Sequence, residues 1–263
     1  ELANQHLQIL IDESKPAIED SVELVIWPET STPAYLLQGN DFFLRWIQSE
    51  LNHSNLIAGI TFYSDEEGKR KYYNSAAHIE KDTVNSVYHK LRLVPVGEYI
   101  PLSNHFPSLS NIDLGQGNFT SGTEYIIMEV NGVKCAVMIC FESTMPYLSR
   151  EFVNKGAEVL IFLVNDGWYE NPPQPQQHAK QVVYRAIENR RPVLRGTNTG
   201  ISLIVDEIGN ISHEIPLNER GAVQSVIKPV NYSTFYTRHG DIFAQLNVLI
   251  SIIFILGSII KRK

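Results

Sequence analysis

The longest apolar run of the chain lies at its carboxyl end, where residues 242–260 include no charged side chain. About 20 such residues, coiled as a helix, cross a bilayer core roughly 30 Å thick. Asp241 precedes the run, and Lys261, Arg262 and Lys263 follow it. Because positive residues stay on the cytoplasmic side of a membrane, the pattern predicts a spanning helix that ends in the cytoplasm, with the bulk of the chain outside.

Four residues weaken this interpretation. Arg238 and His239 place positive charge on the opposite flank and reduce the asymmetry. Gln245 and Asn247 are polar positions within the run, and they favour the alternative of a buried core helix. The membrane span is the favoured interpretation of the two.

The remaining residues alternate amphipathic stretches with short apolar runs. Apolar positions recurring every three or four residues predict helices at 7–18, 41–51, 144–155 and 177–189. Short runs rich in β-branched and aromatic residues predict strands at 23–27, 56–63, 72–80, 86–93, 125–130, 133–140, 158–164, 193–197, 201–206 and 222–228. Asp41 is expected to cap the second helix, which carries Phe43, Ile47 and Leu51 on one stripe. Asn131 and Gly132 form the strongest hairpin signal.

Hairpins mixed with strand–helix–strand units indicate a layered α/β sandwich rather than a barrel. No internal repeat or low-complexity stretch interrupts the pattern. We therefore expect one domain over residues 1–236, followed by the apolar helix 242–260.

The charge balance and the two cysteines argue against several classes of partner and site. The chain has 22 basic and 29 acidic residues, with no basic block before the last three positions, so a nucleic-acid partner is not expected. Cys135 and Cys140 are five positions apart in one strand and should point to opposite faces, which argues against a disulfide between them. No CxxC motif and no Cys/His spacing typical of zinc is present.

Three residues at strand ends are candidates for chemistry. Glu29 follows a buried strand, Lys90 lies near the end of another, and Cys140 ends a third just before a predicted helix. A helix N-terminus lowers the pKa of a thiol, so Cys140 is the candidate nucleophile, whereas Cys135 is expected in the core. Glu142 would oppose thiolate formation, which calls for a nearby cation. Taken singly, each residue has an ordinary alternative role as loop acid, surface charge or core thiol.

The ordered set of motifs resembles the nitrilase superfamily of carbon–nitrogen hydrolases, and within it the apolipoprotein N-acyltransferases. The residues that carry the resemblance are Pro28-Glu29, His89-Lys90, the segment 88–101, 139–142, 165–168, Gln177-His178, Arg185-Ala186, Glu188 and 191–200. The resemblance implies an α/β fold, a layered α-β-β-α nitrilase-like sandwich, with one C-terminal transmembrane helix. It also implies membrane helices and a first strand upstream of Glu1, so the chain is expected to be an N-terminally truncated fragment.

The same resemblance implies roles for individual residues. Glu29 would act as general base and Cys140 as nucleophile, while Lys90 and the backbone N–H of Phe141 would stabilise the oxyanion. Glu98 would be a second carboxylate beside the lysine, and Glu142 an acid of undefined role. No metal or organic cofactor is implied.

The implied partners are a phospholipid acyl donor, a diacylglyceryl-modified lipoprotein acceptor and the membrane. The implied location is the bacterial cytoplasmic (inner) membrane, with the catalytic domain on the extracytoplasmic, periplasmic side. Two alternatives remain open. A membrane-tethered amidase of the same superfamily would let water release the acyl group, and a non-catalytic extracytoplasmic binding domain would keep the fold without the chemistry.

Overall fold

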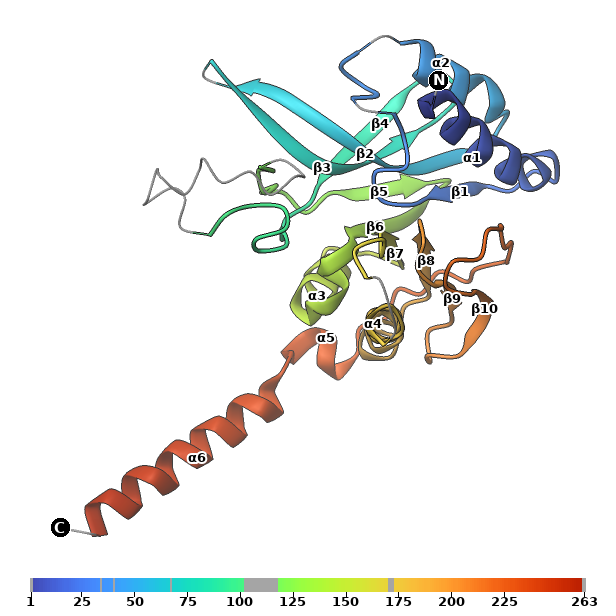
Figure 1. Ribbon diagram of the computed structural model, residues 1–263. Helices are drawn as coiled ribbons and strands as arrows, with labels where there is room; N and C mark the ends of the chain where they lie inside the picture. Colours follow the sequence, from blue (N-terminus) through green and yellow to red (C-terminus); the bar gives the residue numbers. More distant parts are fainter. Residues whose placement is uncertain are drawn as a thin grey trace.

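The computed structural model describes residues 2–33, 35–39, 41–66, 68–101, 118–169 and 173–261. Two β-sheets lie face to face at its centre, with two helices over the outer face of each (Figure 1). The sequence prediction of a layered α-β-β-α sandwich is confirmed.

The first sheet has the strand order β1-β2-β3-β4. Its strands are β1 (Leu24–Trp27), β2 (Asn55–Glu66), β3 (Lys69–Ile79) and β4 (Val84–His89). β1 runs parallel to β2, and the other pairs are antiparallel. The helices α1 (Leu2–Glu19) and α2 (Phe42–Glu50) cover it, burying Leu7 and Ile47 in a first hydrophobic cluster.

The second sheet has the order β10-β9-β8-β7-β6-β5. Its strands are β5 (Ile127–Val130), β6 (Val133–Ile139), β7 (Val159–Val164), β8 (Val193–Thr197), β9 (Ser202–Val205) and β10 (Ile211–Ile215). The central strands β6, β7 and β8 are parallel, and every residue of β7 is buried, as expected for a strand covered on both faces. The helices α3 (Pro146–Asn154) and α4 (Gln174–Asn189) cover this sheet.

The predicted hairpin between β5 and β6 is confirmed. Val130 pairs with Val133, and the two turn residues Asn131 and Gly132 have φ values of 50° and 84°. Positive φ at both positions is the requirement of a type I′ turn, which Asn-Gly meets at low cost.

Three details of the sequence prediction are wrong. Asp41 precedes α2, but its side chain makes no cap hydrogen bond and pairs with Arg45 instead, one helical turn away. The strand predicted over 86–93 ends at His89, so Lys90 follows it. Residues 222–228 form no strand despite their alternating pattern, and the outermost strand on the β9 side of this sheet is β10, which pairs with β9 across the turn that Asp206 stabilises.

The chain ends in α5 (Phe235–His239) and α6 (Ile242–Lys261). α6 projects away from the two sheets (Figure 1), and the apolar window Ile242–Ile260 is not buried inside the molecule. The alternative of a buried core helix is therefore wrong. By length and composition, this helix is able to cross a membrane.

Candidate active site

Glu29 lies directly after β1, in a loop that β2 approaches closely. A Cβ atom at Gly59 would lie 2.3 Å from the carbonyl oxygen of Pro28 and 2.5 Å from the Cα of Glu29, so only glycine fits there. Thr30 has a φ of 46°, a backbone conformation that persists only where surrounding contacts enforce it. The loop thereby keeps Glu29 buried, with 5% of the residue exposed.

Lys90 follows β4, and its ammonium group lies between two buried carboxylates. Its Nζ donates to Glu98 Oε1 at 2.7 Å and to Glu29 Oε1 at 3.3 Å. Asn74 on β3 donates from Nδ2 to the same two oxygens. Burial alone lowers the pKa of Lys90, but Glu29, Cys140 and Glu98 outweigh it and raise the pKa. Lys90 is therefore a fixed positive charge.

Cys140 directly follows β6 and opens a 3-10 turn, Cys140–Thr144. Its φ of 51° is unusual for a residue with a side chain. The Sγ atom of Cys140 lies 3.9 Å from the backbone carbonyl oxygen of Asn165. The backbone N–H of Asn165 donates to Glu29 Oε2 at 2.8 Å. The backbone of one residue thus touches both the thiol and the carboxylate. Phe141 is second in the turn, where a backbone N–H has no acceptor within the turn itself.

The expectation that a helix N-terminus lowers the pKa of Cys140 is wrong. The α-helix begins only at Pro146, after the 3-10 turn. Burial, followed by the negative charge of Glu29, raises the pKa of the Cys140 thiol, and Lys90 offsets this only in part. The thiol is therefore protonated at neutral pH and needs a base to become a nucleophile.

Glu142 is fully buried and connects two strand ends. Its Oε1 accepts from the backbone N–H groups of Leu91 and Arg92, at 2.7 and 3.0 Å, and its Oε2 accepts from the N–H of Ile139 at 2.7 Å. The Tyr88 hydroxyl donates to both oxygens. Glu142 therefore fixes the backbone next to Lys90 against the backbone next to Cys140, a role that its position in the sequence did not reveal.

A second polar cluster lies behind Cys140. His178 on α4 approaches Asp166 Oδ1 with Nδ1 at 2.7 Å, and its Nε2 lies 3.1 Å from the carbonyl oxygen of Cys140. Arg195 on β8 donates to Asp166 Oδ2 at 2.7 Å. These residues stand in motifs quoted for the family resemblance, but sequence reasoning gave them no role. They come from three separate elements, so no local spacing connects them.

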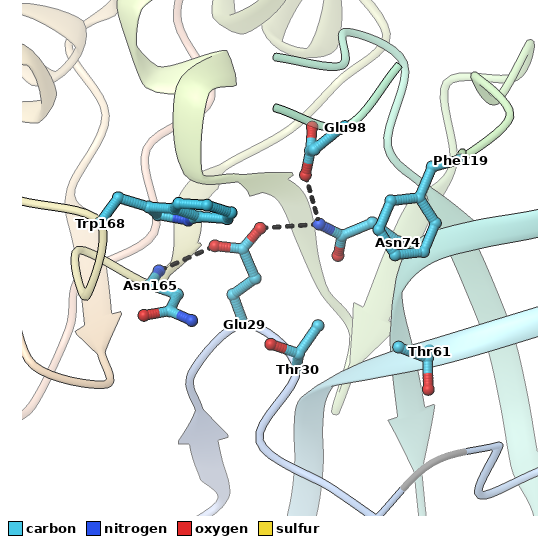
Figure 2. A pocket seen from close by; sticks show the side chains of 8 residues that line it. All are labelled: Glu29, Thr30, Thr61, Asn74, Glu98, Phe119, Asn165 and Trp168. Atoms are coloured by element: carbon cyan, nitrogen blue, oxygen red, sulfur yellow. Dashed lines mark hydrogen bonds between the residues drawn. The ribbon is translucent and has the colours of Figure 1, made fainter. Parts of the chain in front are cut away.

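A pocket of about 280 Å³ opens over the carboxylates. It is lined by Glu29, Thr30, Thr61, Asn74, Glu98, Phe119, Asn165 and Trp168. Figure 2 shows the Glu29 carboxylate between Asn165 and Asn74, with Trp168 and Phe119 to either side. Cys140 is not among the lining residues, and it is 8% exposed. The pocket therefore presents a polar floor of carboxylates between two aromatic side chains.

The structure brings Glu29, Lys90, Glu98 and Cys140 together, as the sequence predicted, and places Cys135 in the core. No group of three or more His, Cys, Asp or Glu side chains suited to a metal occurs within the described residues. A buried thiol, a carboxylate base and a fixed ammonium are the groups needed to attack a carbonyl carbon and to stabilise the oxyanion that forms.

Comparison with known proteins identifies relatives of this chain. Two curated relatives are apolipoprotein N-acyltransferases: one from Thermotoga maritima, 37% identical over 88% of this chain, and one from Geobacter metallireducens, 32% identical over 84%. The chain spans 43% of the length of each.

Solved structures show the same fold at low sequence identity. A carbon–nitrogen hydrolase from Helicobacter pylori G27 matches with a TM-score of 0.61 and 19% identity, covering 83% of this chain and 82% of that one. Nit3 of Saccharomyces cerevisiae, a member of the nitrilase superfamily, matches with a TM-score of 0.62, 18% identity and the same coverage of each chain. The family model for carbon–nitrogen hydrolases matches residues 3–246. With nearly the whole chain matched, this protein belongs to the carbon–nitrogen hydrolase family.

Proposed function

We propose that this chain is the catalytic part of an N-acyltransferase that moves a fatty acyl chain from a phospholipid to the N-terminal amine of a diacylglyceryl-modified lipoprotein. The observation that carries the proposal is the buried Glu29–Lys90–Glu98 cluster beside the Cys140 thiol. The curated relatives, which are named apolipoprotein N-acyltransferases, support the choice of acyl group and acceptor.

The first half-reaction forms a thioester. Glu29 takes the proton of the Cys140 thiol, and Sγ attacks the ester carbonyl of the donor. Lys90 Nζ and the N–H of Phe141 face the negative charge that develops on the carbonyl oxygen. The tetrahedral intermediate collapses, the carbon–oxygen bond breaks, and the leaving alcohol takes the proton back from Glu29.

The second half-reaction forms an amide. Glu29 takes a proton from the attacking amine, whose nitrogen bonds to the thioester carbon. The carbon–sulfur bond then breaks, and Cys140 is protonated again. Glu98 keeps Lys90 charged and in place, and Glu142 holds together the two backbone segments that carry Lys90 and Cys140.

Both substrates reside in a membrane, which gives the carboxyl-terminal helix a function. We place the catalytic domain in residues 1–236 and the membrane span in residues 242–260. The positive charges after the span favour a location on the inner membrane with the domain on the periplasmic side.

Acyl transfer is tested by following the thioester in the membrane-embedded protein. Phospholipid alone should leave a fatty acyl group on Cys140, detected by mass spectrometry of the intact protein. Cys140→Ala should form no adduct, whereas Cys135→Ala should form it at close to the normal rate. Glu29→Gln and Lys90→Met should slow its formation, Lys90→Met by about 10²–10³-fold if it removes one oxyanion donor.

The second substrate separates transfer from hydrolysis. A lipopeptide with a free amino terminus should discharge the thioester, and acetylation of that amine should prevent discharge. If water empties the thioester as fast as the amine does, the protein is a hydrolase. If no adduct forms with any phospholipid, the proposed donor is wrong.

A further inference from the structure

The polar cluster behind Cys140 ends on one particular peptide group. His178 Nε2 lies 3.1 Å from the carbonyl oxygen of Cys140. That carbonyl belongs to the same peptide unit as the N–H of Phe141, the proposed oxyanion donor. A hydrogen bond to the oxygen of a peptide group strengthens its N–H as a donor, because hydrogen-bonded groups in series polarise one another.

The same contact bears on the backbone conformation of Cys140. With φ at 51°, Cys140 holds a backbone conformation that persists only where neighbouring contacts enforce it. His178 is 7% exposed, so its hydrogen bond forms inside the protein, away from competing water. The bond therefore fixes the direction in which the Phe141 N–H points.

Asp166 and Arg195 fix the imidazole ring. Asp166 accepts from Nδ1 with one oxygen and from Arg195 with the other, and both residues are almost fully buried. The carbonyl oxygen of Cys140 can only accept, so its contact with Nε2 is a hydrogen bond in which the ring donates. Ser143 Oγ also lies 2.9 Å from Nε2, and Arg195 Nη2 lies 3.5 Å from Nδ1.

We infer that His178 is a positioning residue that orients and polarises the Cys140–Phe141 peptide for oxyanion stabilisation, with Asp166 holding its ring. The inference rests on the proposed oxyanion role of Phe141. It does not depend on which ester donates the acyl group.

Two amide variants separate the contact of Nδ1 with Asp166 from the contact of Nε2 with the Cys140 carbonyl. In His178→Asn, the shorter amide occupies the position of Nδ1, so it keeps the contact with Asp166 and loses the one with Cys140. In His178→Gln, the longer amide reaches the position of Nε2 and donates to the Cys140 oxygen. His78→Gln is the matched control, because His78 is a buried histidine of β3 that hydrogen-bonds Asn55 at 2.8 Å.

Two reactions of Cys140 in the membrane-embedded protein give the readout. Acylation by p-nitrophenyl acetate passes through an oxyanion, whereas alkylation by iodoacetamide needs the thiolate but forms no oxyanion. His178→Asn should slow acylation roughly 10- to 100-fold, less than the 10²–10³-fold cost of deleting a donor outright, and leave alkylation unchanged. His178→Gln and His78→Gln should stay close to the unmodified protein in both reactions.

The inference is overturned if acylation and alkylation slow together in His178→Asn, which would indicate a general disturbance of the fold or thiol. It is also overturned if the Asn and Gln variants acylate equally fast. Failure of a phospholipid to acylate Cys140 would refute the proposed donor alone, since the p-nitrophenyl acetate comparison is independent of it.

Discussion

Cys135, inside β6, and Cys140, directly after it, illustrate how position separates the thiol proposed to react from a thiol of the core. Cys135 and Cys140 both have a pKa raised by burial. Only Cys140 has a carboxylate and an ammonium close enough to alter its charge, because it lies at the end of β6, where Glu29 and Lys90 converge. Cys135 lies near the start of the same strand and has only Glu158 nearby. Proximity to a base therefore distinguishes the two thiols.

The Cys135 thiol should resist alkylation in alkaline solution. Burial, with a smaller contribution from Glu158, raises the pKa of Cys135 from 9.0 to about 12. Between these values, the unfolded chain carries a thiolate at this position while the folded protein keeps a thiol. We expect iodoacetamide to label Cys135 in urea but not in the native protein across this interval, as read by peptide mass spectrometry.

The raised pKa of Cys135 also determines how the stability of the folded protein changes with pH. Because the folded pKa lies above the unfolded one, the stabilisation is fully present below pH 9 and is lost as the pH rises towards 12. Rapid labelling of native Cys135 at the lower end of the interval would contradict its burial.

At the residue scale, the sequence singled out the side chains that we propose to react, and it did not reveal those that hold them in place. Glu29, Lys90 and Cys140 each follow a strand within a recognisable motif. The role of Glu142 depends on backbone N–H groups of Leu91 and Arg92, about fifty positions earlier in the chain. Contacts between a side chain and a distant backbone leave no pattern in a single sequence.

Between elements, Glu142 provides the link that sets the two halves of the site relative to each other. Lys90 follows a strand of the first sheet and Cys140 a strand of the second, and the sheets meet through packed apolar side chains. Packing of this kind tolerates small sliding motions, whereas hydrogen bonds from Leu91 and Ile139 to one carboxylate do not. The distance between ammonium and thiol therefore depends on this carboxylate.

Glu142→Gln should weaken both the fold and the chemistry. An amide nitrogen cannot accept a hydrogen bond, so either Ile139 or the pair Leu91 and Arg92 would lose its acceptor, at a cost of about 1–3 kcal/mol. Thermal unfolding should occur at lower temperature, and thioester formation on Cys140 should slow. Glu129→Gln, at an exposed position of β5, is the control and should change neither. An unaltered unfolding temperature for Glu142→Gln would show that the link is dispensable.

The order of helices and strands was predictable, and the exceptions have a common physical cause. Periodicity and the Asn-Gly turn identified the hairpin and the central strands, because those patterns are local. Residues 222–228 alternate as a strand does but form none, whereas β10, which the sequence pattern did not predict, pairs with β9. Pairing depends on which edges remain free, which is a property of the assembled sheet.

Across the whole molecule, the candidate span is joined to the catalytic domain through buried polar contacts. Thr234 caps α5 and donates to the carbonyl of Glu188, and Thr237 donates to Asn189 Oδ1. Both acceptors lie at the end of α4, the helix that carries His178. α5 leads directly into α6, which leaves the domain on the side of α3 and α4 (Figure 1). The helix is thus attached to the layer that supports the nucleophile.

The orientation of the span is the remaining prediction. A helix inserts so that the more positive flank stays in the cytoplasm, and here Lys261, Arg262 and Lys263 outweigh Arg238 on the other side. A reporter fused after Lys263 should therefore behave as cytoplasmic, and one inserted in the exposed turn between β2 and β3 as extracytoplasmic. Replacing the three terminal cations by glutamate is the matched control, and it should weaken this preference while leaving the fold of the domain unchanged. Two reporters on the same side would refute the span, since a helix that crosses the bilayer once must separate them.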